Sequence, residues 1–245
     1  MIAVIARLTV RQLLGRGRTL LMAGVALLPI VLAVVYRAGS EDGDQQRWVA
    51  RVLFEGLVVT SLLPLAALVF GTAALGAEIE DGTAVYLLTK PIARSRIIVA
   101  KVVAAWFATS ITVVVSGVAA GAIGLAGAFD ARLLGGFAGA LVAGSLVYTS
   151  LFVLLSVATS RALIAGLAYV FVWEGLVNGL FAGTRLLSVR HYTLAVADLV
   201  AGVPGAVFDA KLAATPAVAL VVVVCAASLW LAVRRLRRFE IGETT

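Results

Sequence analysis

Six long apolar runs occupy most of the sequence and constrain its fold more than any other feature. A helix that spans a bilayer needs about 20 apolar residues, and each run is of that order. The runs lack the alternation of barrel strands, and only helices or closed barrels satisfy their backbone groups within lipid. The sequence therefore predicts an all-α, polytopic membrane protein with a single transmembrane domain over residues 1–245 and six transmembrane helices, at 19–36, 52–76, 97–125, 135–158, 162–181 and 215–233.

The composition excludes several kinds of chemistry. Hydrophobic residues make up 62% of the chain and charged residues 13%, with a mean hydropathy of +1.08, which is far too apolar for a soluble domain. A single histidine, His191, cannot supply paired haem ligands, and a single cysteine, Cys225, excludes an intrachain disulfide and a cysteine-based metal cage. We therefore expect no metal site and no redox cofactor in this chain.

The basic residues predict the orientation. The net charge is +7, and the basic residues lie beside the apolar runs, as is typical of loops that contact the inner leaflet rather than nucleic acid. With the N-terminus in the cytoplasm, 13 of the 20 Lys and Arg residues fall inside and 7 outside. This imbalance predicts that both termini are cytoplasmic. No small-residue cleavage site lies between the first run and Arg37, so we interpret this run as a span rather than a secretory signal.

Two regions beside the spans have a pattern of their own. In residues 1–18, Ile2, Ile5, Leu8 and Leu13 fall on one helical face, opposite basic residues, which predicts an amphipathic helix at the cytoplasmic interface. A basic topology determinant without a mechanical role would give the same pattern. The apolar part of the 182–214 connection is interrupted by glycine and proline, which favours a re-entrant or interfacial helix pair on the outer side. A plain amphipathic surface loop is the alternative.

The connection at 77–96 carries turn and cap signals. Asp81 and Thr83 are suitable helix N-caps, and Gly82 allows a sharp change of direction. A short helix over 84–89 would present Val85 and Leu88 on one side, and Pro91 would end it. These exposed apolar residues need a partner surface, although an ordinary capped interfacial helix would have the same sequence.

At this connection the chain resembles the ABC-2 type permeases, the membrane subunits of ATP-binding-cassette exporters. Eight residues of the motif fall at the expected spacing: Glu78, Gly82, Thr83, Leu87, Leu88, Pro91, Arg94 and Lys101. The resemblance implies that the segment docks on an ATPase subunit, and the candidate coupling residues are Glu78, Glu80, Asp81, Gly82, Thr83, Val85, Leu87, Leu88, Pro91, Arg94 and Lys101. It further implies a multi-pass protein of a prokaryotic cell membrane that pairs with a second copy of itself or with a related permease.

The ATPase itself is expected in a separate chain. The glycines at 71 and 76 are followed by Ala77 and Glu78, so this sequence shows no Walker A loop to hold nucleotide phosphates. ATP and Mg²⁺ are therefore expected on the partner, and the resemblance implies no catalytic residues and no cofactor in this chain. The resemblance leaves the cargo open, since an apolar and hydroxyl-lined path suits a lipophilic solute, whereas related permeases also serve in metalloenzyme assembly.

Few polar residues lie within the predicted spans. Glu174 and Asn178 are four residues apart, and with Ser145 and Thr149 they are our candidates for a translocation path. Helix packing is the alternative role for each of them, and the small-residue pairs Gly117–Gly121 and Gly135–Gly139 also favour close helix contact. Glu55 is expected to reach the interface.

Two other functional classes compete with the exporter. An ATP-independent secondary transporter or channel should show internal repeats and more intramembrane charge than this chain has. An intramembrane enzyme is disfavoured because we find no HExxH pair, no Gly-x-Ser-x-Gly elbow and no clustered acids.

Overall fold

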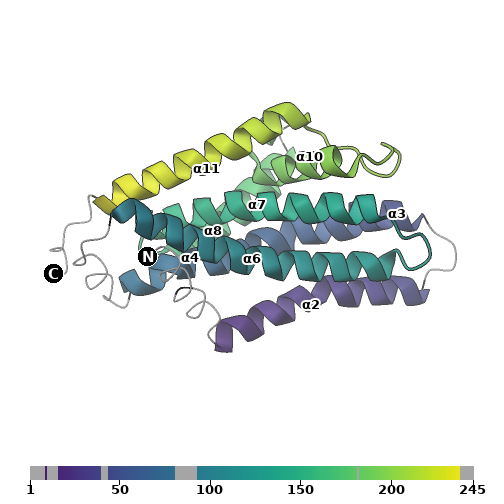
Figure 1. The fold of residues 1–245 in the computed structure, drawn as a ribbon, viewed down its shortest axis with the longest axis horizontal. Helices are drawn as coiled ribbons and strands as arrows, with labels where there is room; N and C mark the ends of the chain where they lie inside the picture. The colour runs from purple at the N-terminus through teal and green to yellow at the C-terminus, as the bar shows by residue number, and fades with distance from the viewer. Residues whose placement is uncertain (1–8, 10–15, 40–43, 81–92, 181, 238–245) are drawn as a thin grey trace.

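The computed structural model describes residues 9, 16–39, 44–80, 93–180 and 182–237, and it confirms the all-helical fold. None of these residues forms a strand. The helices lie roughly along one axis (Figure 1). In chain order they are α2 (Arg16–Gly39), α3 (Gln45–Trp48), η1 (Val49–Leu62), α4 (Leu63–Glu80), α6 (Arg94–Gly124), α7 (Ala131–Ala158), α8 (Ala162–Ala168), η2 (Tyr169–Val177), α9 (Asn178–Leu180), η3 (Ala182–Leu187), α10 (Val189–Ala201) and α11 (Ala214–Arg237).

Five helices of the described chain are long and apolar enough to cross a membrane, at Leu20–Gly39, Gln45–Gly76, Arg94–Gly124, Ala131–Ala158 and Ala214–Arg237. The predicted fifth span, 162–181, has instead a shorter apolar helix, Ala162–Val177. Its winding is π-helical from Tyr169, and it ends where the Asn178 side chain donates to the Trp173 carbonyl at 3.0 Å. The predicted count of six spans is therefore not confirmed by helix length.

The chain direction alternates along the bundle (Figure 1). We call the end where α4 ends, α6 begins and α11 ends the Arg94 end, and the end that holds α10 the α10 end. Because α7 finishes at the Arg94 end and α11 begins at the α10 end, the chain between them must travel the length of the bundle. The segment from α8 to α10 makes this passage.

Helix α7 lies at the centre and contacts α4, α6, α10 and α11. Its first turn is capped by Asp130, whose carboxylate accepts hydrogen bonds from the Arg132 and Leu133 amides at 2.9 and 3.1 Å. Near the α10 end, Phe137 of α7 stacks on Phe54 and meets Phe208 edge-on, with ring centroids 4.4 and 5.1 Å apart. These rings join η1, α7 and the segment before α11.

The close contact predicted at Gly117 and Gly121 is confirmed. A Cβ built on Gly121 would lie 2.6 Å from Leu134 Cδ2, and one on Gly117 would lie 3.2 Å from Leu141 Cδ1. The prediction for the other pair is wrong within this chain, because a Cβ on Gly135 or on Gly139 would meet nothing within 4 Å. Adjacent Gly136 faces the core instead, where α10 approaches α7.

Between η3 and α11 the structure has one α-helix rather than a pair. Ser188 caps α10 by accepting a hydrogen bond from the His191 amide, and Gly202 ends the helix in the left-handed conformation, with φ of 55°. The predicted connection 182–214 therefore consists of the short η3 turn, α10 and an irregular stretch that leads into α11.

Candidate functional site

Most of the predicted coupling segment lies outside the described residues, namely Asp81, Gly82, Thr83, Val85, Leu87, Leu88 and Pro91. The same holds for nearly all of the predicted amphipathic helix at 1–18, since the described chain starts α2 at Arg16. Glu78 and Glu80 belong to the last turn of α4, and Arg94 begins α6. The two helices that flank the segment therefore both end at the Arg94 end of the bundle.

Arg94 and Lys101 both interact with other residues of the bundle. The Arg94 guanidinium donates to the Leu236 carbonyl, which ties the start of α6 to the end of α11. Lys101 is only 2% exposed on α6, and it interacts with a partner within the chain. Arg94 is thus placed to hold the flank of the coupling segment, whereas the burial of Lys101 argues against direct contact with another protein.

Two of the predicted path residues serve helix packing. The Thr149 hydroxyl donates to the Ser145 carbonyl at 2.6 Å, and the Ser145 hydroxyl lies 2.6 Å from that of Ser110 on α6. Both residues of α7 are fully buried. Their hydroxyls are therefore satisfied by their own helix and by α6, which is the packing role that the sequence analysis left open.

Glu174 is the centre of a buried hydrogen-bond network. Its carboxylate accepts from the Ser188 hydroxyl at 2.5 Å, from the Val189 amide at 2.8 Å and from the Tyr169 hydroxyl at 3.0 Å. Ser188 and Val189 form the start of α10, where a helix favours a negative charge. Glu174 therefore anchors the N-terminus of α10 to η2, and Trp173 adds a bond from its indole nitrogen to the Leu187 carbonyl at 3.1 Å.

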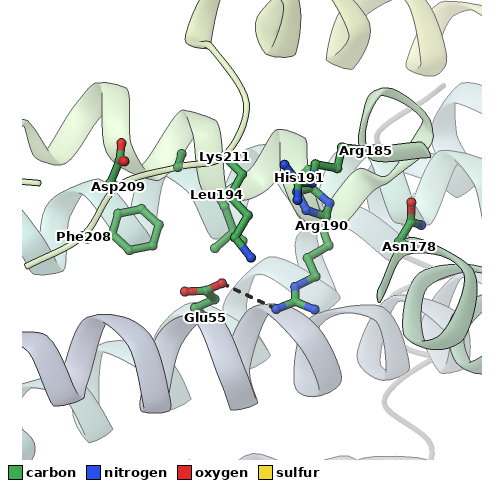
Figure 2. Close-up of a pocket in the computed structure, with 10 residues that line it drawn as sticks. Glu55, Asn178, Arg185, Arg190, His191, Leu194, Phe208, Asp209 and Lys211 are labelled. Atoms are coloured by element: carbon green, nitrogen blue, oxygen red, sulfur yellow. Dashed lines mark ion pairs between the residues drawn. The ribbon is translucent and has the colours of Figure 1, made fainter. Parts of the chain in front are cut away.

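Asn178 lines a different region, a cavity of about 110 Å³ near the start of α10 that we call the Arg190 cavity (Figure 2). Asn178 and Glu174 were expected to share one helical face, but η2 is π-helical between them, which changes their relative direction. The cavity is lined by Glu55, Asn178, Arg185, Arg190, His191, Leu194, Phe208, Asp209, Ala210 and Lys211.

An ion pair crosses the Arg190 cavity. Arg190 Nη2 of α10 lies 3.6 Å from Glu55 Oε1 of η1, and Figure 2 shows the two side chains pointing toward each other. The prediction that Glu55 reaches the interface missed this partner. In the sequence the cations of the cavity read only as topology signals, although Arg185, Arg190 and His191 lie close together there and indicate local charge.

Two arginines hold the wall of the cavity in place. Arg47 Nε donates to the Ala206 carbonyl and Arg51 Nε to the Val207 carbonyl, both at 3.1 Å. These bonds join α3 and η1 to the irregular stretch after α10, which supplies Phe208, Asp209 and Lys211 to the cavity.

His191 connects the cavity to the Glu174 network. Its Nδ1 lies 2.9 Å from Ser188 Oγ, and Ser188 donates its only hydroxyl proton to Glu174. His191 must therefore carry a proton on Nδ1 and donate it to Ser188. Burial, followed by the charges of Arg190, Arg185 and Lys211, lowers the pKa of His191 from 6.5 to about 4.

The lowered pKa of His191 predicts a loss of stability in acid. Because the unfolded chain takes up the proton near pH 6.5 and the folded chain only near pH 4, this contribution is complete above pH 6.5 and is lost as the pH falls toward 4. His191→Gln keeps a neutral side chain with an N–H donor at every pH. We expect the difference in Tm between the wild-type protein and this variant in detergent to shrink from pH 7.5 to pH 4.5. A difference independent of pH would contradict the assignment.

Residues 16–183, more than half of the chain, match the family described as ABC-2 family transporter protein. The chain is thus a helical membrane protein of the ABC-2 transporter family, and the resemblance seen at the motif is confirmed. A search of curated proteins found no match. The matched region includes Glu55, Glu174 and Asn178 and ends before Arg185.

Proposed function

We propose that this chain is the transmembrane permease subunit of an ABC exporter, powered by ATP hydrolysed on a separate ATPase chain. The family match over 16–183 is the observation that carries the proposal. In this account the Arg94 end is cytoplasmic, the passage through α8, η2 and α9 is the sixth span, and ATP and Mg²⁺ bind to the partner. The excess of basic residues predicted for the inside supports this orientation.

The proposed ATPase contact is the segment between α4 and α6. Both flanking helices end at the Arg94 end, so any partner that binds there can act on two spans at once. The bond from Arg94 to the Leu236 carbonyl links the same place to α11. A force applied between α4 and α6 would therefore reach three helices, which suits a bundle that changes arrangement with the state of its partner.

The proposed path lies outside the core of a single chain. Ser145, Thr149 and Glu174 are buried with their hydrogen bonds made inside the bundle. We therefore propose that two permease copies in a prokaryotic cell membrane form the path between them. Asn178 remains the one predicted path residue with an unpaired buried oxygen, and it faces the Arg190 cavity.

The substitution Leu88→Asp tests the proposed ATPase contact. A charge at a central apolar anchor should cost several kcal/mol of binding, roughly a loss of two orders of magnitude in affinity. We expect the tagged wild-type chain, purified from its native membrane, to retain a protein with a Walker A motif in mass spectra, and the variant to lose it while still inserting.

Phe129→Asp is the matched control, because Phe129 is exposed between α6 and α7, beyond the end of α6 that lies opposite Arg94. It introduces the same charge far from the proposed contact and should leave the ATPase bound. Undiminished retention by Leu88→Asp would contradict this interface, and the absence of any ATPase from the wild-type preparation would contradict the proposed function.

A further inference from the structure

The Arg190 cavity carries an excess of positive charge. Arg185, Arg190 and Lys211 are cationic, Glu55 and Asp209 are anionic, and the lowered pKa of His191 leaves it neutral at physiological pH. Within the described part of the chain, neither Arg185 nor Lys211 makes an ion pair or hydrogen bond through its side chain. In Figure 2 the Lys211 and Arg190 side chains extend toward Glu55, whereas Asp209 points away from them.

Two polar atoms of the cavity are buried without a partner among the described residues. Arg190 Nε donates no hydrogen bond, and Asn178 Oδ1 accepts none. The 3.6 Å between Arg190 Nη2 and Glu55 Oε1 is also longer than a hydrogen bond. A buried unpaired donor is costly, so the guanidinium is open to an acceptor that can meet its fork of N–H groups.

The shape of the cavity restricts what that acceptor can be. Its volume of about 110 Å³ has room for several waters or one small group, and not for a bulky solute. The bonds from Arg47 and Arg51 fix the stretch that carries Lys211, and Glu174 fixes the start of α10 that carries Arg190. The backbone that carries Arg190 and Lys211 is thus fixed before anything binds, which lowers the cost of binding.

We infer that the Arg190 cavity binds one tetrahedral oxyanion, of the phosphate or sulfate class, with Arg190, Arg185 and Lys211 supplying its positive charges. Arginine pairs with such oxygens through two parallel N–H bonds, and lysine adds a point charge. The oxyanion has two possible sources, a free ion in solution or the phosphate of a lipid headgroup. Binding needs neither ATP nor the partner, so the inference stands apart from the proposed function.

The test measures thermal stability of the purified full chain in an uncharged maltoside detergent. Sodium phosphate and sodium sulfate are titrated at pH 7.5 against chloride at constant ionic strength, because a ligand that binds the folded state raises Tm in a saturable way. Phosphatidylglycerol is then titrated against diacylglycerol, which lacks the phosphate. Saturation by the free ions assigns a soluble oxyanion, and saturation by phosphatidylglycerol alone assigns a lipid headgroup.

Three variants and one control separate the site from general charge effects. Arg190→Gln and Lys211→Gln should each weaken the apparent affinity for the oxyanion at least tenfold. Because the Lys211 side chain is exposed, Lys211→Gln should fold as the wild-type protein does. Glu55→Gln removes a carboxylate that competes for Arg190 and should tighten binding severalfold. Arg132→Gln changes an exposed arginine at the start of α7, outside the cavity, and should bind as the wild-type protein does.

The variants are expected to change the affinity in opposite directions, weaker in Arg190→Gln and Lys211→Gln and tighter in Glu55→Gln. Stabilisation that never saturates, equal losses in Arg132→Gln and Lys211→Gln, or weaker binding in Glu55→Gln would each overturn the inference. No stabilisation of the wild-type protein by either the free ions or phosphatidylglycerol would do the same.

Discussion

Replacing Glu174 with leucine should destabilise the protein by about 3 to 5 kcal/mol and release α10 from η2. By itself, removal of a charge from a membrane span is expected to be tolerated. The structure reverses this expectation because the carboxylate accepts three hydrogen bonds, from Tyr169, Ser188 and Val189. Leucine would leave the Val189 amide buried without an acceptor and would remove the carboxylate that accepts from the Tyr169 and Ser188 hydroxyls.

Glu174→Gln is the matched control for this change. Its amide oxygen still accepts from the start of α10, so most of the stability should remain. Thermal unfolding in detergent gives the loss of stability, and limited proteolysis within 182–213 shows whether α10 has detached. Leucine and glutamine variants that unfold at the same temperature as the wild-type protein would show that the network contributes little.

Gly136→Ala should destabilise the contact between α7 and α10 by roughly 1 to 3 kcal/mol, the usual cost of overpacking. An added Cβ would lie 2.6 Å from the Ala201 backbone nitrogen and 2.7 Å from its Cα. Backbone atoms cannot turn aside as a flexible side chain does, so the whole end of α10 has to move. Because α10 carries Arg190, the shift should also disturb the Arg190 cavity.

Gly139→Ala on the same helix is the control. A Cβ there meets nothing within 4 Å, and alanine favours helix over glycine by about 0.5 to 1 kcal/mol, so this variant should be as stable as the wild-type protein or more so. Chemical or thermal unfolding of the three proteins side by side measures the difference. Equal stability of the two variants would contradict the close approach of α10 to α7.

The apolar runs predicted the long helices because burial in lipid depends on local composition. The predicted limits fell short where polar turns continue a helix beyond the bilayer. Helix α7 begins at Ala131, four residues before the predicted start, because the Asp130 cap allows it, and α6 begins at Arg94 rather than at 97. Hydropathy alone does not report such turns.

The site could not be predicted in the same way, because its partners are remote in the sequence. Glu55 pairs with Arg190 through the packing of α10 against η1, and Glu174 finds its donors only after the chain has turned through η3. Both acids also lie in π-helical stretches, η1 and η2, which no apolar pattern indicates. Such stretches often accompany functional positions, since they redirect a side chain from the expected face.

The most direct test of the central claim is the ATP turnover of the reconstituted transporter. The chain and the ATPase that purifies with it are placed together in liposomes, and hydrolysis is measured for the wild-type permease, for Leu88→Asp and for the ATPase alone. The account predicts that the wild-type permease changes the rate severalfold and that Leu88→Asp returns it to the rate of the ATPase alone. The account would be contradicted if the ATPase hydrolysed ATP at the same rate with the wild-type permease, with Leu88→Asp and alone.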